Sequence, residues 1–232
     1  SWHDYKTALR PSYEPIVVAR APRNGYTFTE CAMQFGSGSF NIGGCRIDRP
    51  DRETDGYPAN VITDGGLPNG VQNYFYTAKA QTWEREAGLD SFDTVPIGMS
   101  NGAQIHGKGY DKGQDIGYNR VIERKNTHPT VKPIELTEYL ARLIKPPQRD
   151  EPNRLLIPFS GVASEMIGAQ LAGWDEVVGV EMTDEYIPIA VSRLKWWSQF
   201  SSILEAKAHY DSVQRGQQAD NEAEANGQLS LF

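Results

Sequence analysis

Residues 154–181 read RLLIPFSGVASEMIGAQLAGWDEVVGVE, and the expected fold follows from their pattern. The apolar run at 154–159 predicts a buried strand, which is followed by a turn of small residues. Ser164–Ala172 is expected to be a helix ended by Gly173, and Val177–Glu181 predicts a second strand. Strand, turn, helix and strand in this order are typical of a parallel α/β sheet.

The neighbouring segments extend this pattern in both directions. A helix is expected from about Asp184 to Trp197 on the C-terminal side. On the N-terminal side, residues 134–144 (IELTEYLARLI) place their apolar side chains on one helical face, and Pro146-Pro147 ends the helix. Further upstream, residues 14–20 (EPIVVAR) predict a short buried strand.

Between Arg23 and Asn126 the sequence is dominated by Gly, Asn, Asp and Pro. We expect only brief strand-like pieces there, such as residues 73–76, and a long loop over residues 98–117. Loops of that length in a compact domain are usually functional or disordered.

Composition limits the classes of protein that remain. With 39% hydrophobic and 10% aromatic residues in 232, the chain can bury a core. It contains no apolar run of membrane-spanning length and no export leader, so we expect a cytoplasmic protein with no membrane partner. The spacing of Cys31 and Cys45 matches no zinc pattern, so no metal site is predicted.

Charge restricts how the chain could meet nucleic acid. The net charge of −7 argues against a protein that simply coats nucleic acid, but it allows a local basic cleft. Residues 106–132 carry six basic and three acidic side chains, and the alternative to a binding surface there is a solvated loop. The candidate nucleic-acid-binding residues are Lys108, Lys112, Arg120, Arg124 and Lys125.

The turn after the first strand has the features of a nucleoside site. In open parallel sheets, ligands bind at the carboxyl ends of the strands, where small residues let backbone N–H groups approach. Glu181 ends the next strand about 20 residues later, where an acid can accept hydrogen bonds from two ribose hydroxyls. The alternative is a tight connection without a ligand.

The wider motif order supports the nucleoside interpretation. HPTVKP at 128–133, a helix, Leu156–Gly161 (LIPFSG), Gly179–Glu181 (GVE) and Glu185-Tyr186 follow one another. This order resembles the DNA aminomethyltransferases, in the permuted class whose cofactor motifs come last. More loosely, short segments between residues 9 and 80 resemble phage and prophage members of that group, and the resemblance implies a restriction-modification type of enzyme. The resemblance implies a Rossmann-like α/β sheet that binds S-adenosylmethionine, incomplete in this chain and carrying a loop-rich insert. It favours methylation of adenine N6 over cytosine N4.

The resemblance also assigns the cofactor-binding residues. Thr130, Lys132 and Pro133 would enclose the methionine end, Glu181 would hold the ribose, and Met182 would pack on the adenine. The turn beneath the cofactor would be formed by Pro158, Phe159, Ser160, Gly161 and Ser164. A second interpretation makes Thr130 the cap, and Pro133 the first turn, of the following helix.

Three departures from the family pattern concern function. Ile157 stands where the family commonly has Asp, and Ala163 stands where it commonly has Gly. The catalytic tetrad, an Asp, Asn or Ser followed by Pro-Pro and an aromatic residue, occurs nowhere in the chain, so no catalytic residue is assigned. We therefore expect a methyltransferase fragment that needs an N-terminal catalytic half or a partner chain. The alternative is a non-catalytic cofactor- or DNA-binding specificity module.

Four regions follow from this comparison. Residues 1–30 would end the catalytic half, 31–126 would recognise double-stranded DNA, 127–210 would bind the cofactor, and 211–232 would form a flexible polar tail. The last five residues resemble the short peptide with which bacterial replication and repair proteins bind the sliding clamp. Gln228, Leu229, Leu231 and Phe232 would make that contact, or else the peptide folds back onto the domain.

Overall fold

The computed structural model describes residues 15–48, 55–58, 60, 62, 80–99 and 120–229. The chain divides into two compact units, Ser1–Ser39 and Phe40–Phe232. The first contains helix α1 (Phe28–Phe35). The second contains η1 (Gly43–Cys45), α2 (Thr82–Glu86), β1 (Val95–Met99), β2 (Arg120–Arg124), α3 (Ile134–Ile144), β3 (Arg154–Ile157), α4 (Ser164–Leu171), β4 (Glu176–Gly179), α5 (Tyr186–Trp197) and α6 (Ile203–Leu229). The described chain is thus a mixed α/β protein.

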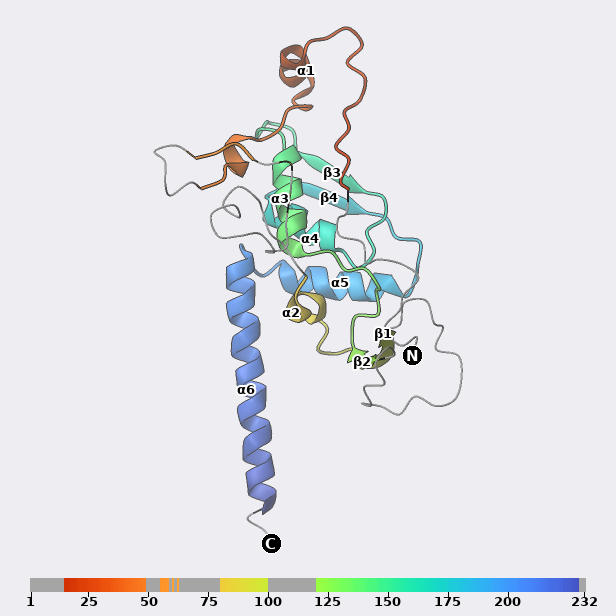
Figure 1. Ribbon diagram of the computed structural model, residues 1–232, viewed down its shortest axis with the longest axis vertical. Helices are drawn as coiled ribbons and strands as arrows, with labels where there is room; N and C mark the ends of the chain where they lie inside the picture. Colours follow the sequence, from red (N-terminus) through yellow and green to blue (C-terminus); the bar gives the residue numbers. More distant parts are fainter. Residues whose placement is uncertain are drawn as a thin grey trace, which may run out of the picture. The chain divides into compact units, whose positions relative to one another are not determined.

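Strands β3 and β4 form a parallel pair and lie side by side (Figure 1). Leu156 lies opposite Val178 in the register. The pairing continues past the strands, because the Val180 N–H donates to the Ile157 carbonyl at 2.9 Å and the Ser160 N–H donates to Val180 at 2.9 Å. The predicted sequence of strand, helix, parallel strand and helix is confirmed, with ends shifted by one to two residues.

Helices α3 and α4 approach each other closely at Gly168. A Cβ atom placed at this glycine would lie 2.3 Å from Thr137 Oγ1 and 2.5 Å from the backbone nitrogen of Glu138. The Thr137 hydroxyl lies 3.0 Å from the carbonyl oxygen of Ser164, the first residue of α4. The contact therefore brings the start of α4 against the first turn of α3, whose predicted bounds are confirmed.

The described core consists of two clusters of buried apolar side chains. One lies between the helices and contains Trp83, Ala87, Ile134, Ile167, Trp197 and Ala206. The other lies beside the β3–α4 turn and contains Leu89, Val131, Val162 and Ile189. Short α2 contributes to the first cluster, although its five residues gave no periodic signal in the sequence.

One face of the β3–β4 sheet carries exposed apolar side chains. Leu156 is 61% exposed, Val178 55% and Val180 53%, whereas Ile157, which alternates with Leu156, is buried at 9%. Helix α4 contacts both strands. Parallel sheets in proteins are normally covered on both faces.

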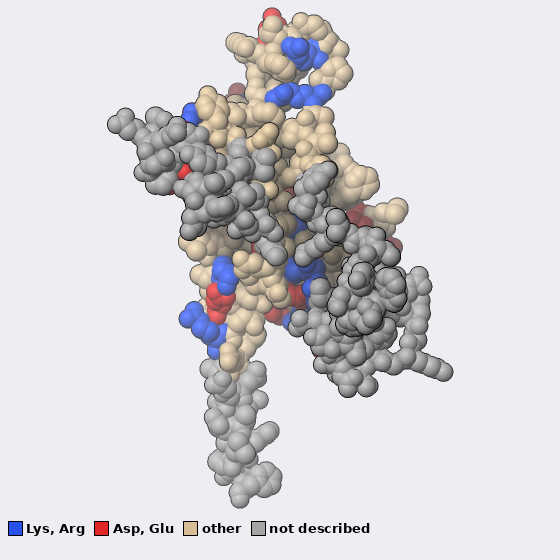
Figure 2. All heavy atoms as spheres, viewed as in Figure 1, with Lys and Arg blue, Asp and Glu red and all other residues tan. Residues whose placement is uncertain are grey.

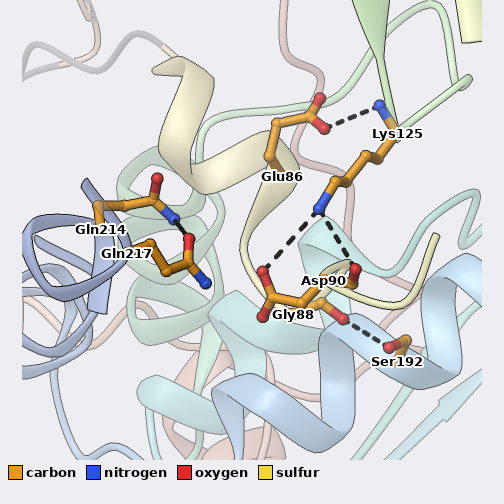
Figure 3. Close-up of polar contacts among 7 residues, drawn as sticks. All are labelled: Glu86, Gly88, Asp90, Lys125, Ser192, Gln214 and Gln217. Atoms are coloured by element: carbon orange, nitrogen blue, oxygen red, sulfur yellow. Dashed lines mark hydrogen bonds and ion pairs between the residues drawn. The ribbon is translucent and has the colours of Figure 1, made fainter. Parts of the chain in front are cut away.

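Polar contacts join the end of α2, and the residues just after it, to α5 and to the chain after β2 (Figure 3). The Ser192 hydroxyl on α5 donates to the Gly88 carbonyl at 2.5 Å. Glu86 accepts a hydrogen bond from the backbone N–H of Lys125 at 2.9 Å. These contacts fix the end of α2 against α5 and against the chain that follows β2.

The N-terminal unit differs from the expected strand over residues 14–20. Pro15–Arg20 form no strand, and Ile16, Val17 and Val18 are 48%, 86% and 46% exposed. An apolar segment forms a strand only with a pairing partner, and in the described part of this unit none pairs with it. Instead the unit contains α1, where Thr27 and Glu30 form a capping box.

The hairpin β1–β2 is antiparallel, with Ile97 opposite Ile122. Sequence analysis predicted a loop from residue 98, because the stretch to residue 117 is rich in glycine and has no helical periodicity. The strand runs to Met99, and residues 100–117 of the expected loop lie outside the described part, as do residues 73–76.

The structure also corrects the expected flexible tail. Helix α6 runs from Ile203 to Leu229, through most of residues 211–232. Frequent Ala, Glu and Gln favour the helix, and Lys207 pairs with Asp211 one turn later at 2.6 Å. Among the described residues, neither α6 nor any other helix is both long and apolar enough to cross a membrane.

The α3–α4 contact predicts a large effect of a single methyl group. Gly168→Ala should destabilise the fold by roughly 1–3 kcal/mol, because its Cβ would overlap backbone atoms that cannot move freely. Gly216→Ala on α6 is the matched control, since a Cβ there meets nothing within 4 Å. It should stabilise the helix by roughly 0.5–1 kcal/mol. Urea unfolding of both variants measures the effect, and equal free energies of unfolding would contradict the described packing.

Candidate nucleoside-binding site

The turn between β3 and α4 holds its backbone in an unusual conformation. Gly161 has φ of +50° and Ala163 has φ of +68°, both in the left-handed region. The Ala163 N–H donates to the Ser160 carbonyl at 2.8 Å, which closes the turn. Ser160 and Ser164 are buried, whereas Phe159 just before the turn is 90% exposed. The turn therefore presents backbone rather than bulky side chains at the end of β3.

Glu181 joins this turn to the end of β4. Its carboxylate accepts hydrogen bonds from the Gly161 N–H at 2.8 Å and from the Thr183 N–H at 2.8 Å. The Thr183 bond, with a further contribution from Gly161, holds the pKa of Glu181 below its ordinary value. The neighbouring Met182 is 94% exposed. An ionised carboxylate thus lies at the carboxyl ends of two parallel strands.

His128 lies against the same turn. A Cβ added at Gly161 would come within 2.9 Å of His128 Nε2. The ring packs edge-on against Tyr186, with centroids 4.7 Å apart, and its Nδ1 accepts from the Thr130 N–H at 3.2 Å. Burial lowers the pKa of His128. A neutral imidazole with Nδ1 as acceptor therefore connects the HPTVKP segment to the turn.

The other residues of HPTVKP differ in position. Thr130 is exposed, Lys132 is half-buried, and the Lys132 charge counteracts the rise that burial causes in the pKa of Glu165 on α4. Pro133 is the N-cap of α3 and makes no side-chain capping bond. The interpretation of Thr130 as the helix cap is therefore wrong, because α3 begins at Ile134.

Two buried charged residues, Arg193 and Glu84, form hydrogen bonds with the backbone of the turn and of α3. Arg193 on α5 is fully buried and donates to the Val162 carbonyl, to Ser164 Oγ at 3.3 Å and to the Glu84 carbonyl at 3.0 Å. The Glu84 carboxylate accepts from the Ile134 N–H at 3.3 Å. Burial lowers the pKa of Arg193 to about 10 and raises that of Glu84. Arg193 therefore remains a cation at neutral pH.

We refer to Pro158–Ser164, Glu181 and His128 together as the turn site. The structure brings the predicted turn residues and Glu181 together, and it places Thr130 beside them through His128. Sequence analysis missed His128, Tyr186 and Arg193 as site residues. For His128 and Tyr186 the signal was present in the quoted motifs, whereas a single Arg within an amphipathic helix gave none.

The candidate DNA-binding residues are only partly described. Lys108 and Lys112 lie outside the described residues, and for Arg120 only its backbone in β2 is described. Arg124 is half-buried, and Lys125 Nζ lies 4.0 Å from Asp90 Oδ1 and 3.5 Å from the Asp90 carbonyl oxygen (Figure 3). Figure 2 shows one face of the molecule. Among the described residues on this face, Lys and Arg lie in small groups, several with Asp or Glu beside them.

The remaining predicted sites are distributed as follows. Gln228 and Leu229 end α6 but their side chains are not described, and Leu231 and Phe232 lie outside the described residues. No group of metal-binding side chains occurs in the described ranges, where Cys31 and Cys45 are both free thiols. A surface hollow between α2, α3 and α6 lies away from the turn site and is lined by residues including Trp83, Tyr139, Leu204 and Lys207.

Comparisons with protein-family models, with curated proteins and with solved structures found no match to this chain. The geometry of the turn site therefore carries the functional argument. A carboxylate, left-handed backbone and two exposed apolar side chains gather at the ends of parallel strands. This arrangement can accept the hydroxyls of a sugar and contact a flat apolar group, and the turn site itself contains no paired nucleophile and base.

The lowered pKa of His128 predicts a pH dependence of stability. The folded state keeps His128 neutral, whereas the unfolded chain takes up a proton near pH 6.5. The free energy of unfolding should therefore be highest above that pH and fall as the pH decreases below it. His128→Gln, which keeps a hydrogen-bond acceptor, should show a smaller decrease between pH 7.5 and 5.5 in urea unfolding. An unchanged pH slope in this variant would contradict the assignment.

Proposed function

We propose that this chain is the cofactor-binding and target-recognition part of an S-adenosylmethionine-dependent DNA methyltransferase. The reaction would transfer a methyl group to an exocyclic amino group, with adenine N6 favoured over cytosine N4. The observation that carries the proposal is the hydrogen bond between Glu181 and Gly161, which lie 20 residues apart. It joins the acid after the second strand to the small-residue turn after the first, as a nucleoside site requires.

The residues of the turn site fit the nucleoside part of this cofactor. Glu181 would accept hydrogen bonds from the ribose hydroxyls, and because its carboxylate is ionised it is a strong acceptor. Phe159 and Met182, both about nine-tenths exposed, would cover the adenine. Glycine at 161 lets the His128 ring pack directly against the turn, because a Cβ there would lie 2.9 Å from His128 Nε2. Thr130, Lys132 and Pro133 would enclose the methionine end, as the HPTVKP motif implies.

When bound, the cofactor would supply an electrophilic methyl group, and transfer also needs groups that hold the flipped target base. The sequence contains no Pro-Pro-aromatic tetrad to stack on a flipped base and to hydrogen-bond its amino group. The catalytic half would therefore come from another segment. The exposed apolar face formed by Leu156, Val178 and Val180 supports this, because both faces of a parallel sheet are normally covered by other elements.

Cofactor binding should depend on Glu181. Glu181→Ala should weaken binding of S-adenosylmethionine roughly tenfold or more, because the ribose hydroxyls lose a charged acceptor. Glu185→Ala, which removes an exposed carboxylate four residues later, is the matched control and should bind like wild type. Isothermal titration calorimetry measures both affinities. Equal affinities of Glu181→Ala and wild type would remove the basis of the proposal.

A non-catalytic specificity module is the second candidate, and the missing tetrad is the observation that favours it. Transfer of a tritiated methyl group to DNA distinguishes the two. The purified chain alone should transfer none, and activity should appear when a catalytic half bearing the tetrad is added. Absence of activity in every such mixture, with cofactor binding intact, would favour the module. Methyl transfer by the isolated chain, lost in Glu181→Ala, would contradict the need for a second half.

A further inference from the structure

Arg193 is the most deeply buried charged side chain in the described part of unit 2, and its hydrogen bonds converge on the turn. It is 0% exposed, and its guanidinium donates to the Val162 carbonyl and to Ser164 Oγ. These two acceptors lie on either side of Ala163. Burying a cation destabilises the fold unless the cation is hydrogen-bonded and paired. These contacts therefore fix the position of the guanidinium, and the guanidinium in turn fixes the positions of Val162 and Ser164.

Ala163 is the residue that needs such support. Its φ of +68° lies in the left-handed region, where the Cβ of an L-residue comes too close to the following carbonyl oxygen. Ala163 is also fully buried, so the surrounding structure must impose this conformation. Arg193 anchors the residue before it and the residue after it.

The same guanidinium also connects the turn, through Glu84, to the start of α3. Its Nη2 donates to the Glu84 carbonyl at 3.0 Å, and the Glu84 carboxylate accepts from the Ile134 N–H at 3.3 Å. Ile134 begins α3, directly after Thr130–Pro133. The turn and the HPTVKP segment are therefore positioned through one buried network.

We propose that Arg193 is a positioning residue: its guanidinium holds Val162–Ser164 in the left-handed turn that the cofactor site requires. The part that concerns cofactor affinity rests on the proposed function. The part that concerns the turn does not, because the anchored conformation is a property of the unliganded chain. Neither part assigns Arg193 a contact with the cofactor.

The first experiment measures the turn without any ligand. Hydrogen exchange of the Gly161 and Ala163 amides should become roughly tenfold faster in Arg193→Lys. An ammonium has a single nitrogen, whereas Arg193 bonds the turn through Nη1 and the Glu84 carbonyl through Nη2. Ser164→Ala, which removes one acceptor and keeps the guanidinium, should show a smaller increase at the same amides. It also decides the result if Arg193→Lys does not fold.

Trp197→Phe is the matched control, because it weakens the packing of α5 without removing a hydrogen bond to the turn. Trp197 is fully buried one turn further along α5 and makes no hydrogen bond to the turn. This variant should lower the global stability without selectively increasing exchange at Gly161 and Ala163. Equal exchange increases at these amides in the control and in both test variants would overturn the inference.

The second experiment tests whether relief of strain explains the effect. Arg193→Lys should weaken binding of S-adenosylmethionine roughly tenfold, and adding Ala163→Gly should restore most of it, because glycine adopts a positive φ without the same cost. Failure of glycine to restore affinity would overturn the positioning mechanism. If wild type binds no S-adenosylmethionine while the exchange result holds, the proposed function fails and the anchoring of the turn by Arg193 stands.

Discussion

The close contact between α3 and α4 is the constraint on which the rest of the described fold depends. It requires that residue 168 carry no side chain, and it leaves the Thr137 hydroxyl 3.0 Å from the carbonyl oxygen of Ser164. Because the first turns of both helices meet there, the segments that precede them must also converge. One is HPTVKP and the other is the β3–α4 turn, so a packing contact between helices determines which loops can share a ligand.

The sequence predicted an element correctly where its local apolar pattern matched the packing partners that the segment meets in the fold. The apolar runs at β3 and β4 and the amphipathic pattern of α3 each gave the correct element, because these segments meet a partner nearby in the sequence. Residues 15–20 show the opposite case: β-branched side chains favour a strand, but a strand also needs a neighbour, and sequence alone does not report its presence. The helical course of α6 was missed because polar composition was given more weight than helix propensity.

The candidate site also has a part that could be predicted from the sequence and a part that could not. Glu181 and the turn could be found from spacing, since an acid about 20 residues after a small-residue turn is the arrangement expected of a nucleoside site. His128 was quoted as part of a motif without a role, and only the structure shows its ring against Gly161. Arg193 could not be found, because its partners include Glu84 on α2, a five-residue helix from a distant and weakly patterned region. Ala163, noted as a departure from the family pattern, occupies a position where glycine would be unstrained.

Helix α6 has a mechanical consequence for whatever follows its last turn. Its 27 residues span roughly 40 Å at 1.5 Å per residue. A flexible segment of equal length would allow its end to sample every direction at a shorter average distance. A continuous helix instead acts as a rigid spacer. It keeps Leu229 at a fixed distance from Ile203, and any rotation of the first turn is transmitted to the last turn. An attachment at Leu229 would therefore meet its counterpart in one orientation, and the length of this spacer would determine which sites it reaches.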